Sequence, residues 1–256
     1  MPSEYSTKLE QIRDLLVNST SSVAFTGAGF STPSGISDFR SPGTGLWTRV
    51  AEIPKSGTIQ GFAQDPQSFY DWFGPFAKLI LEAEPNPAHY ALAEMEALGF
   101  IQTVITQNAD MLHQRAGTKH ILEVHGSLAQ ATCIRCYKEA PALPMLEQFF
   151  VDGKVPICRE CGGVMKPNVI LTDEQLPAKV LVAARKAVRE SDVMLIAGTS
   201  LSGGPATALV KMSLEHGAQH IIVNKTPSRF DNYAEVMIYA DVVDVLPDID
   251  AKLWRN

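Results

Sequence analysis

Two pairs of cysteines are the residues whose type and spacing most directly suggest chemistry. Each pair is spaced Cys-x-x-Cys, and 21 residues separate the two pairs. Four thiolates in this arrangement can surround one zinc ion, and a site whose ligands all come from the protein is structural rather than catalytic. We predict one structural zinc, with four free buried cysteines as the alternative, at Cys133, Cys136, Cys158 and Cys161.

A glycine-rich turn, Gly27-Ala28-Gly29, follows the short apolar segment 22–26. Glycines allow a backbone to approach a phosphate closely, and a following helix start offers N–H donors. The dinucleotide fingerprint would require a glycine where the chain has Thr32, and it would also require an acidic residue about 20 positions further on. The turn therefore favours a phosphate site but argues against an ordinary dehydrogenase, and a simple tight turn is the alternative.

His125 closes another apolar segment and precedes Gly126. A histidine in such a place is, by itself, more often structural than catalytic. Asn108 and Asp110 also follow a predicted strand, and imidazole has a reference pKa of about 6.5, which suits a general base. The candidate catalytic residues are therefore His125, Asn108 and Asp110.

The elements that must position these residues are strands alternating with helices. Helices are expected at 4–17, 66–84 with a break or kink at Gly74-Pro75, 87–98, 176–190, 205–216 and 232–238. Strands are expected at 22–26, 100–105, 121–124, 168–171, 192–197, 220–223 and 241–245. The strands are continuous apolar runs, which is typical of a parallel sheet buried on both faces.

The polar motifs follow the ends of these strands. Ligands of open α/β sheets bind outside the carboxyl ends of the strands. Five motifs at one edge therefore predict one site, and they are 27–29, 107–110, His125, 198–200 and Asn224.

The chain is expected to form an α/β fold with a Rossmann-like parallel sheet in its large domain. That domain would comprise 1–40, 86–126 and 168–256. A helical insertion at 41–85 and a zinc-ribbon insertion at 127–167 would form a smaller domain.

Composition is that of a globular protein and argues against disorder, collagen-like repeats and coiled coil. The 256 residues are 45% hydrophobic, with a formal net charge of −6. The acidic balance argues against direct nucleic-acid binding, because phosphate neutralisation needs an excess of Lys and Arg. No apolar run is long enough to span a membrane, and the first residues lack the apolar core of a secretory signal. We expect a cytoplasmic protein with no membrane partner.

The motifs occur in an order that resembles the sirtuin family of NAD-dependent protein lysine deacylases over nearly the whole chain. They are Gly27-Ala28-Gly29-Phe30-Ser31, Gly35-Ile-Ser-Asp-Phe-Arg40, Thr106-Gln-Asn-Ala-Asp110, His125-Gly126, the four cysteines, Lys166-Pro-Asn-Val169, Gly198-Thr-Ser200, Asn224 and Asp241-Val-Val-Asp-Val-Leu-Pro247. In this family the acyl oxygen of a modified lysine attacks the nicotinamide ribose of NAD and nicotinamide leaves. The products are free lysine and 2′-O-acyl-ADP-ribose.

The resemblance also implies roles for individual residues. His125 would be the general base, and Asn108 and Asp110 would act beside it. The zinc would do no chemistry. The cofactor side would comprise Gly27, Ala28, Gly29, Asp38, Phe39, Arg40, Gln107, Asn108, Asp110, Gly198, Thr199, Ser200, Asn224 and Val242. The partner would be an acylated lysine in a protein or peptide, bound near Val169, Thr172, Asp173, Glu174 and Gly203.

Several residues depart from the family pattern around the expected nicotinamide and acyl-lysine pockets. The departures are Phe30, Ser37, Ala109, Met111, Thr172, Asp173 and Gly203, where the family usually has Ile, Pro, Ile, Gly, Phe, Gly and Val. Phe30 would add bulk to the pocket, and Asp173 would add charge where a peptide backbone lies. A remodelled or engineered pocket with an altered substrate or weak activity, a non-enzymatic NAD or ADP-ribose binder, and an ADP-ribosyl transferase are the alternatives. A Tyr-x-x-Arg pair is absent from 48–73, so acidic acyl groups are not expected.

Overall fold

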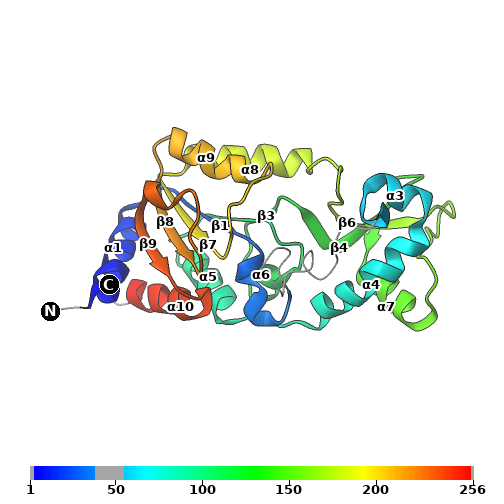
Figure 1. Ribbon diagram of the computed structural model, residues 1–256, viewed down its shortest axis with the longest axis horizontal. Helices are drawn as coiled ribbons and strands as arrows, with labels where there is room; N and C mark the ends of the chain where they lie inside the picture. The colour runs from blue at the N-terminus through cyan, green and yellow to red at the C-terminus, as the bar shows by residue number, and fades with distance from the viewer. Residues whose placement is uncertain (1–2, 38–54, 255–256) are drawn as a thin grey trace.

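A six-stranded parallel sheet forms the larger part of the molecule (Figure 1). The structure is a computed structural model that describes residues 3–37 and 55–254. The strand order is β3-β2-β1-β7-β8-β9, and every neighbouring pair is parallel. The strands are β1 (Ser22–Thr26), β2 (Thr103–Thr106), β3 (Ile121–Glu123), β7 (Val193–Ala197), β8 (Gln219–Asn224) and β9 (Ala234–Tyr239). This confirms the predicted Rossmann-like sheet, whose strand order reverses between β1 and β7.

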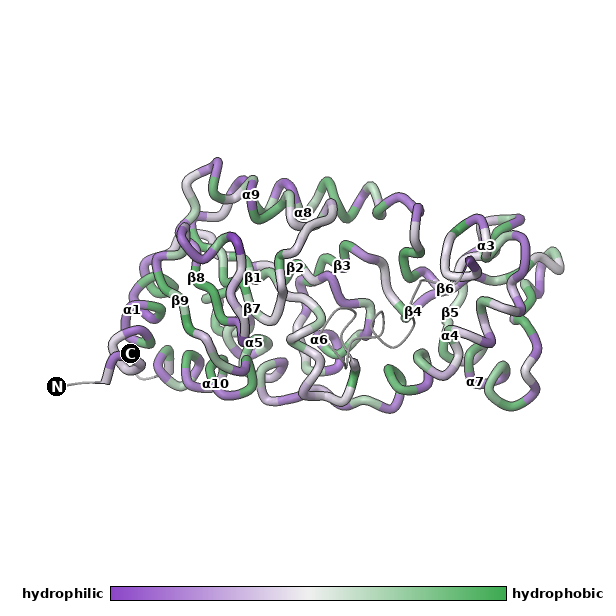
Figure 2. Tube along the Cα trace, viewed as in Figure 1, coloured by the Kyte–Doolittle hydropathy of each residue, from purple (hydrophilic) through white to green (hydrophobic). Residues whose placement is uncertain are grey.

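Helices cover both faces of this sheet and explain why its central strands are apolar throughout. Successive side chains of a strand point to opposite faces. Ala24 accordingly packs with α1 (Glu4–Asn18), α5 (Pro87–Ala97) and α10 (Val242–Leu253). Its neighbours Val23 and Phe25 pack on the other face, with α8 (Ala178–Glu190) and α9 (Thr207–Glu215). The hydrophobic strands lie between these helical layers in Figure 2.

The predicted order of elements near the C-terminus is wrong. Residues expected as a helix at 232–238 form η4 (Asp231–Tyr233) and the edge strand β9, and those expected as a strand at 241–245 begin α10. Apolar residues of β9 pack against clusters on both of its faces, so its sequence lacks the strict alternation of a half-exposed strand. Asp241 caps α10 by accepting a hydrogen bond from Val243 N (3.3 Å). The buried side chains then recur at helical spacing, at Val242, Val245, Leu246, Ile249 and Leu253.

A smaller part of the molecule is built around a three-stranded antiparallel sheet of order β5-β4-β6. Its elements are β4 (Gly126–Cys133), β5 (Glu139–Pro141), β6 (Met165–Val169), η3 (Lys55–Gly57), α3 (Ile59–Gln64), α4 (Pro66–Glu82) and α7 (Leu143–Asp152). The strand expected at 168–171 lies earlier in the chain and belongs to this sheet. An aromatic core of its own fills this part, including Phe62, Phe69, Tyr70, Phe73 and Phe149. The residue boundaries of the two domains stay a prediction.

The expected break at Gly74-Pro75 is wrong, because α4 continues through both residues as one helix. Gly74 is required for packing rather than for a turn. A Cβ atom at this position would lie 2.6 Å from Cε1 of Phe149 on α7. Helix α7 can therefore approach α4 closely only while position 74 has no side chain.

We predict that Gly74→Ala destabilises the protein although alanine is the better helix former. Alanine gains about 0.5–1 kcal/mol from helix propensity. Overpacking a buried contact costs about 1–3 kcal/mol. Chemical denaturation should show a net loss of stability, and adding Phe149→Leu should recover part of it. A more stable Gly74→Ala protein would contradict this packing argument.

Candidate functional site

The carboxyl ends of β1 and β7 bring two glycine turns into backbone contact. A Cβ atom at Gly29 would lie 2.9 Å from the carbonyl oxygen of Gly198, and one at Gly198 would lie 2.4 Å from Phe30 N. Gly198 also has a left-handed backbone, with φ of 62°. Neither position can carry a side chain without moving the neighbouring loop. The glycines predicted from sequence are therefore required by this close approach as well as by any phosphate.

Thr199, after the end of β7, contacts residues at the ends of three other strands. The Gln107 side chain donates to Oγ1 of Thr199 (2.9 Å), and a Cβ atom at Gly27 would lie 2.8 Å from Cβ of that threonine. Asn224 accepts a hydrogen bond from Thr199 N (2.9 Å) and donates one to Thr199 O (3.0 Å). These contacts join residues predicted for the cofactor side on β1, β2, β7 and β8.

Asn108 and Asp110 are buried and linked through Ser31. The Asn108 side chain donates to Gly27 O and to Oγ of Ser31, both at 3.0 Å. Ser31 in turn donates to Asp110 (2.6 Å), which also accepts a hydrogen bond from Leu112 N (3.0 Å) at the start of α6 (Leu112–Arg115). Burial raises the pKa of Asp110, although both hydrogen bonds oppose this shift. The sequence alone assigned no role to Ser31, although its position two residues after the glycine turn could have indicated one.

His125 lies half-buried at the end of β3, between the cofactor residues and the predicted substrate segment. Its Nδ1 lies 3.1 Å from Gln107 O. A carbonyl can only accept, so the neutral ring carries its proton on Nδ1, and Nε2 is the basic nitrogen. The backbone oxygen of His125 accepts from Ile170 N (2.9 Å), next to Val169. Val169 pairs with Gly126, so the substrate segment is bonded directly to the backbone of the candidate base.

The predicted substrate segment is held by a turn and an ion pair. Glu174 accepts from Leu171 N (2.8 Å) and pairs with Lys166 (2.9 Å), a buried cation that also donates to Val169 O (2.9 Å). Thr172 pairs on one edge with the backbone of Gly57 and Ile59. Lys166 received no role from its sequence alone, although a lysine inside an apolar segment was a usable signal.

Three departures from the family pattern affect the backbone. Met111 and Asp173 stand where the family usually has glycine, and both adopt left-handed φ values, of 63° and 64°. Gly203 stands where the family has valine, and its φ is 135°. A valine would be strained in this backbone conformation.

Other predicted residues are placed less centrally. Phe30 is fully buried in the core, so the expectation that it adds bulk to an open pocket is wrong. Ala28 is half-buried in η1 (Ala28–Phe30), and Val242 is buried at the start of α10. Ser200 is exposed and contacts Ser202 (3.1 Å between Oγ atoms). Asp38, Phe39 and Arg40 lie outside the described residues.

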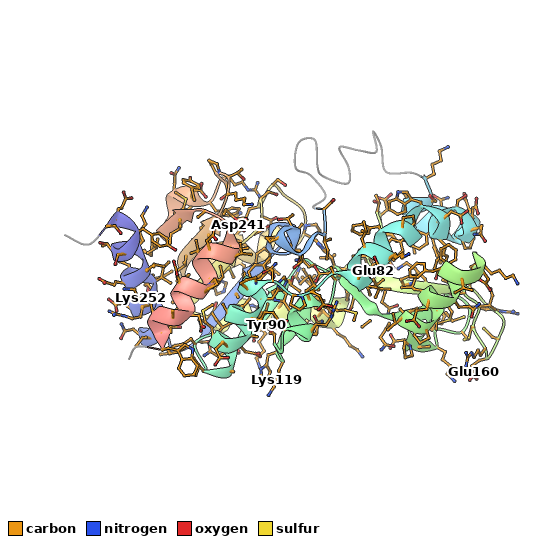
Figure 3. The ribbon with its side chains drawn as sticks, turned by 90° about the horizontal axis from the view of Figure 1, so that it is seen from below. Glu82, Tyr90, Lys119, Glu160, Asp241 and Lys252 are labelled. Atoms are coloured by element: carbon orange, nitrogen blue, oxygen red, sulfur yellow. The ribbon has the colours of Figure 1, made fainter. Side chains whose placement is uncertain are left out.

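The four cysteines form one cluster whose sulfur atoms all lie within 4.8 Å of one another. The distance between the Sγ atoms of Cys133 and Cys161 is 3.5 Å, and that between Cys136 and Cys158 is 3.7 Å. Four thiolates about 2.3 Å from a zinc ion would lie about 3.8 Å apart, so the cluster fits one structural zinc. Figure 3 shows Glu160, between two of these cysteines, at the end of the molecule away from the large sheet. A zinc ion held by these four cysteines would have only protein ligands and would serve to stabilise the fold.

Comparisons with known proteins agree with this combination of a glycine-lined sheet edge and a separate zinc cluster. The Sir2 family model matches residues 27–205. The chain is 40% identical over 238 residues to a Sulfurisphaera tokodaii protein named "NAD-dependent protein deacetylase", covering 93% of each chain. It is also 40% identical over 249 residues to an Archaeoglobus fulgidus protein named "NAD-dependent protein deacylase 2", covering 97% of each.

Solved structures resemble the whole chain as well. One described as "Sir2-p53 peptide-NAD+" has a TM-score of 0.86 and 33% identity, covering 97% of this chain and 99% of that one. Another, "Structure of Sir2Tm bound to a propionylated peptide", has a TM-score of 0.84 and 33% identity, covering 96% and 98%. Fold and site define a nucleotide-binding α/β protein with a structural metal cluster. The chain belongs to the Sir2 family, the sirtuins.

We predict that Gly198→Ala weakens NAD binding at least about tenfold, since its methyl group would push the two glycine turns apart. Isothermal titration with NAD measures this effect. Gly217→Ala is the matched control, because Gly217 also has positive φ (82°) but no atom of the described residues lies within 4 Å of the place that its methyl group would take. Equal NAD affinity in both variants would contradict the role of the close approach.

Removal of zinc should lower the melting temperature of the protein, because the ion is bound by the folded cluster only. Elemental analysis should give one zinc per chain and almost none for Cys158→Ser. A chelator should lower the melting temperature of the wild-type protein but not that of the variant. A wild-type protein without zinc and with unchanged stability would overturn this assignment.

Proposed function

We propose that this chain is an NAD-dependent protein lysine deacylase that transfers the acyl group to ADP-ribose and releases nicotinamide. The observation that carries the proposal is the position of His125. Its ring contacts the Gln107 backbone on the cofactor side, and its own backbone holds Ile170 on the substrate side. A base placed between both substrates suits acyl transfer from one to the other.

Different residues of this chain would bind NAD, orient its ribose and accept the proton. NAD supplies the ribose carbon that accepts the acyl oxygen when nicotinamide leaves. The glycine turns at 27–29 and 198 would hold the phosphate side, with Asn224 and Thr199 toward the adenosine half. Asn108 and Asp110 would orient the nicotinamide ribose from their buried, hydrogen-bonded positions. Nε2 of His125 would take the proton of the ribose hydroxyl that attacks the transferred acyl carbon.

The acylated lysine would enter beside the segment 169–174. Thr172 pairs with Gly57 and Ile59 along one edge. A peptide strand added to this segment would use its opposite edge. Asp173 is exposed there and brings a negative charge. A peptide with a basic residue near the modified lysine is therefore the better substrate.

A remodelled pocket with altered substrate or weak activity is the second candidate, and one observation favours it. Gly203 has a backbone conformation that the family's valine would not adopt without strain. A glycine with this backbone in place of the family's valine supports a pocket of altered shape. We also propose a cytoplasmic location, because a zinc site made of thiolates needs reduced cysteines.

Incubation with NAD and a panel of acyl-lysine peptides tests the proposal. Nicotinamide and O-acyl-ADP-ribose should form in equal amounts, and His125→Ala should lower kcat at least about 100-fold while NAD still binds. No turnover with any acyl chain would overturn the proposal. Undiminished NAD binding without turnover would instead support a non-enzymatic binder, and label transfer from NAD to protein would support an ADP-ribosyl transferase.

We further predict that Asp173→Gly raises activity toward neutral peptides. The substitution removes the charge and provides the residue that the left-handed backbone prefers, which relieves strain of about 1 kcal/mol. The peptide KM should fall several-fold in Asp173→Gly and further when Thr172→Phe is added. Unchanged KM values in both variants would argue that this segment does not bind the peptide.

A further inference from the structure

A chain of buried hydroxyl groups connects the backbone of Asn108 to a histidine that the proposed mechanism does not use. Asn108 N donates to Oγ1 of Thr106 (3.0 Å), and Oγ1 of Thr26 donates to the same oxygen (2.9 Å). Oγ1 of Thr26 also lies 2.9 Å from Nε2 of His113. All four residues are buried, and His113 is only 1% exposed. The chain runs directly beneath the candidate cofactor residues.

The direction of each hydrogen bond follows from counting protons. A hydroxyl group has one proton, and Thr26 gives its proton to Thr106. Nε2 of His113 must then donate to Thr26, so the His113 proton lies on Nε2 and its Nδ1 carries a lone pair. That Nδ1 is buried and has no hydrogen-bond partner among the described residues.

A second buried histidine, His89, has an N–H group without a partner among the described residues, where His113 has a lone pair. Nδ1 of His89 accepts a hydrogen bond from Asn86 N (3.3 Å), so the His89 proton lies on Nε2, which is also buried and without a partner in the described part of the chain. The two imidazole rings are 4.9 Å apart between centroids. An N–H group without a partner in one ring and a lone pair without a partner in the other thus belong to neighbouring rings in the described part of the chain. The opposite His113 tautomer would place two unpaired N–H groups in neighbouring rings.

The ring of Phe30 packs against the rings of both histidines. Its ring centroid lies 4.9 Å from that of His89 and 5.0 Å from that of His113. Burial lowers the pKa of His89 to about 2 and that of His113 to about 3. Both rings are therefore neutral at any pH at which the protein works. The hydrogen-bond directions among His113, Thr26 and Thr106 stay the same over that range.

We propose that His113 is a positioning residue for NAD: through Thr26 and Thr106 it holds the backbone of Asn108 in the conformation that orients the ribose. The inference rests on the proposed function, since it assumes that Asn108 contacts NAD. It assigns His113 an effect on the binding of NAD but none on the acyl-lysine peptide, because the chain of hydrogen bonds ends at Asn108 on the cofactor side.

Steady-state kinetics of nicotinamide release with substituted full-length proteins test the proposal. His113→Leu removes the donor and should raise the KM for NAD about tenfold, while the peptide KM changes less than about twofold. His113→Gln keeps an N–H donor and should recover most of the affinity. Thr26→Val interrupts the same chain with little change in volume and should reproduce the effect if His113→Leu does not fold.

His220 provides a matched control. It is fully buried, its Nε2 lies 2.5 Å from Oγ of Ser213, and its Nδ1 has no partner among the described residues. It lies near the amino end of β8, away from the candidate site. His220→Leu and Ser213→Ala should lower the melting temperature as the His113 and Thr26 substitutions do, but leave the KM for NAD unchanged.

The outcomes separate this inference from the proposed function. An inactive wild-type protein would overturn the proposed function. An active wild-type protein whose His113→Leu and Thr26→Val variants keep the wild-type KM for NAD would overturn only the inference. Long-range ¹H–¹⁵N spectra of the histidine rings should place the His113 proton on Nε2 and the His89 proton on Nε2. A proton on Nδ1 of His113 would also overturn it.

Discussion

The contact between two backbone turns at the centre of the sheet is the constraint on which the rest of the site depends. Gly29 and Gly198 approach so closely that neither tolerates a Cβ atom. This approach places the ends of β1 and β7 in a common surface, from which Thr199 reaches Gln107 and Asn224. Asn108 then bonds to Gly27 O, and the ring of His125 lies beside Gln107. Each further functional side chain is positioned against this glycine-lined junction rather than by its own strand alone.

Much of this arrangement could be predicted from the sequence because it follows from local patterns. Apolar runs such as Val193–Ala197 must be covered on both faces, so they predict a parallel sheet, and its carboxyl edge predicts where ligands bind. The spacing of the four cysteines was likewise enough to predict the metal cluster. Both signals lie within short segments of the chain.

What could not be predicted depends on contacts between distant segments. β9 is an edge strand with apolar residues on both faces, so it lacks a strict alternation, and the short apolar run that begins α10 resembled a strand more closely. Gly74 resembled a helix breaker because its neighbour Phe149 is 75 residues away in sequence. The burial of Phe30 and the link from Ser31 to Asp110 likewise arise only when β1, β2 and α5 are packed together. Residue type alone cannot distinguish a pocket wall from a core position.

The separation of the hydrophobic interior into distinct clusters has a consequence for dynamics. The aromatic residues around α4, α7 and the antiparallel sheet form their own core, apart from the two layers that cover the large sheet. Regions with separate cores can open at different free energies, as separate cooperative units. The zinc-bearing part could thus unfold locally while the parallel sheet stays protected from hydrogen exchange. Such an opening would break the strand pairing between Gly126 and Val169, so the proposed substrate segment would lose its position while the proposed cofactor residues on the parallel sheet kept theirs.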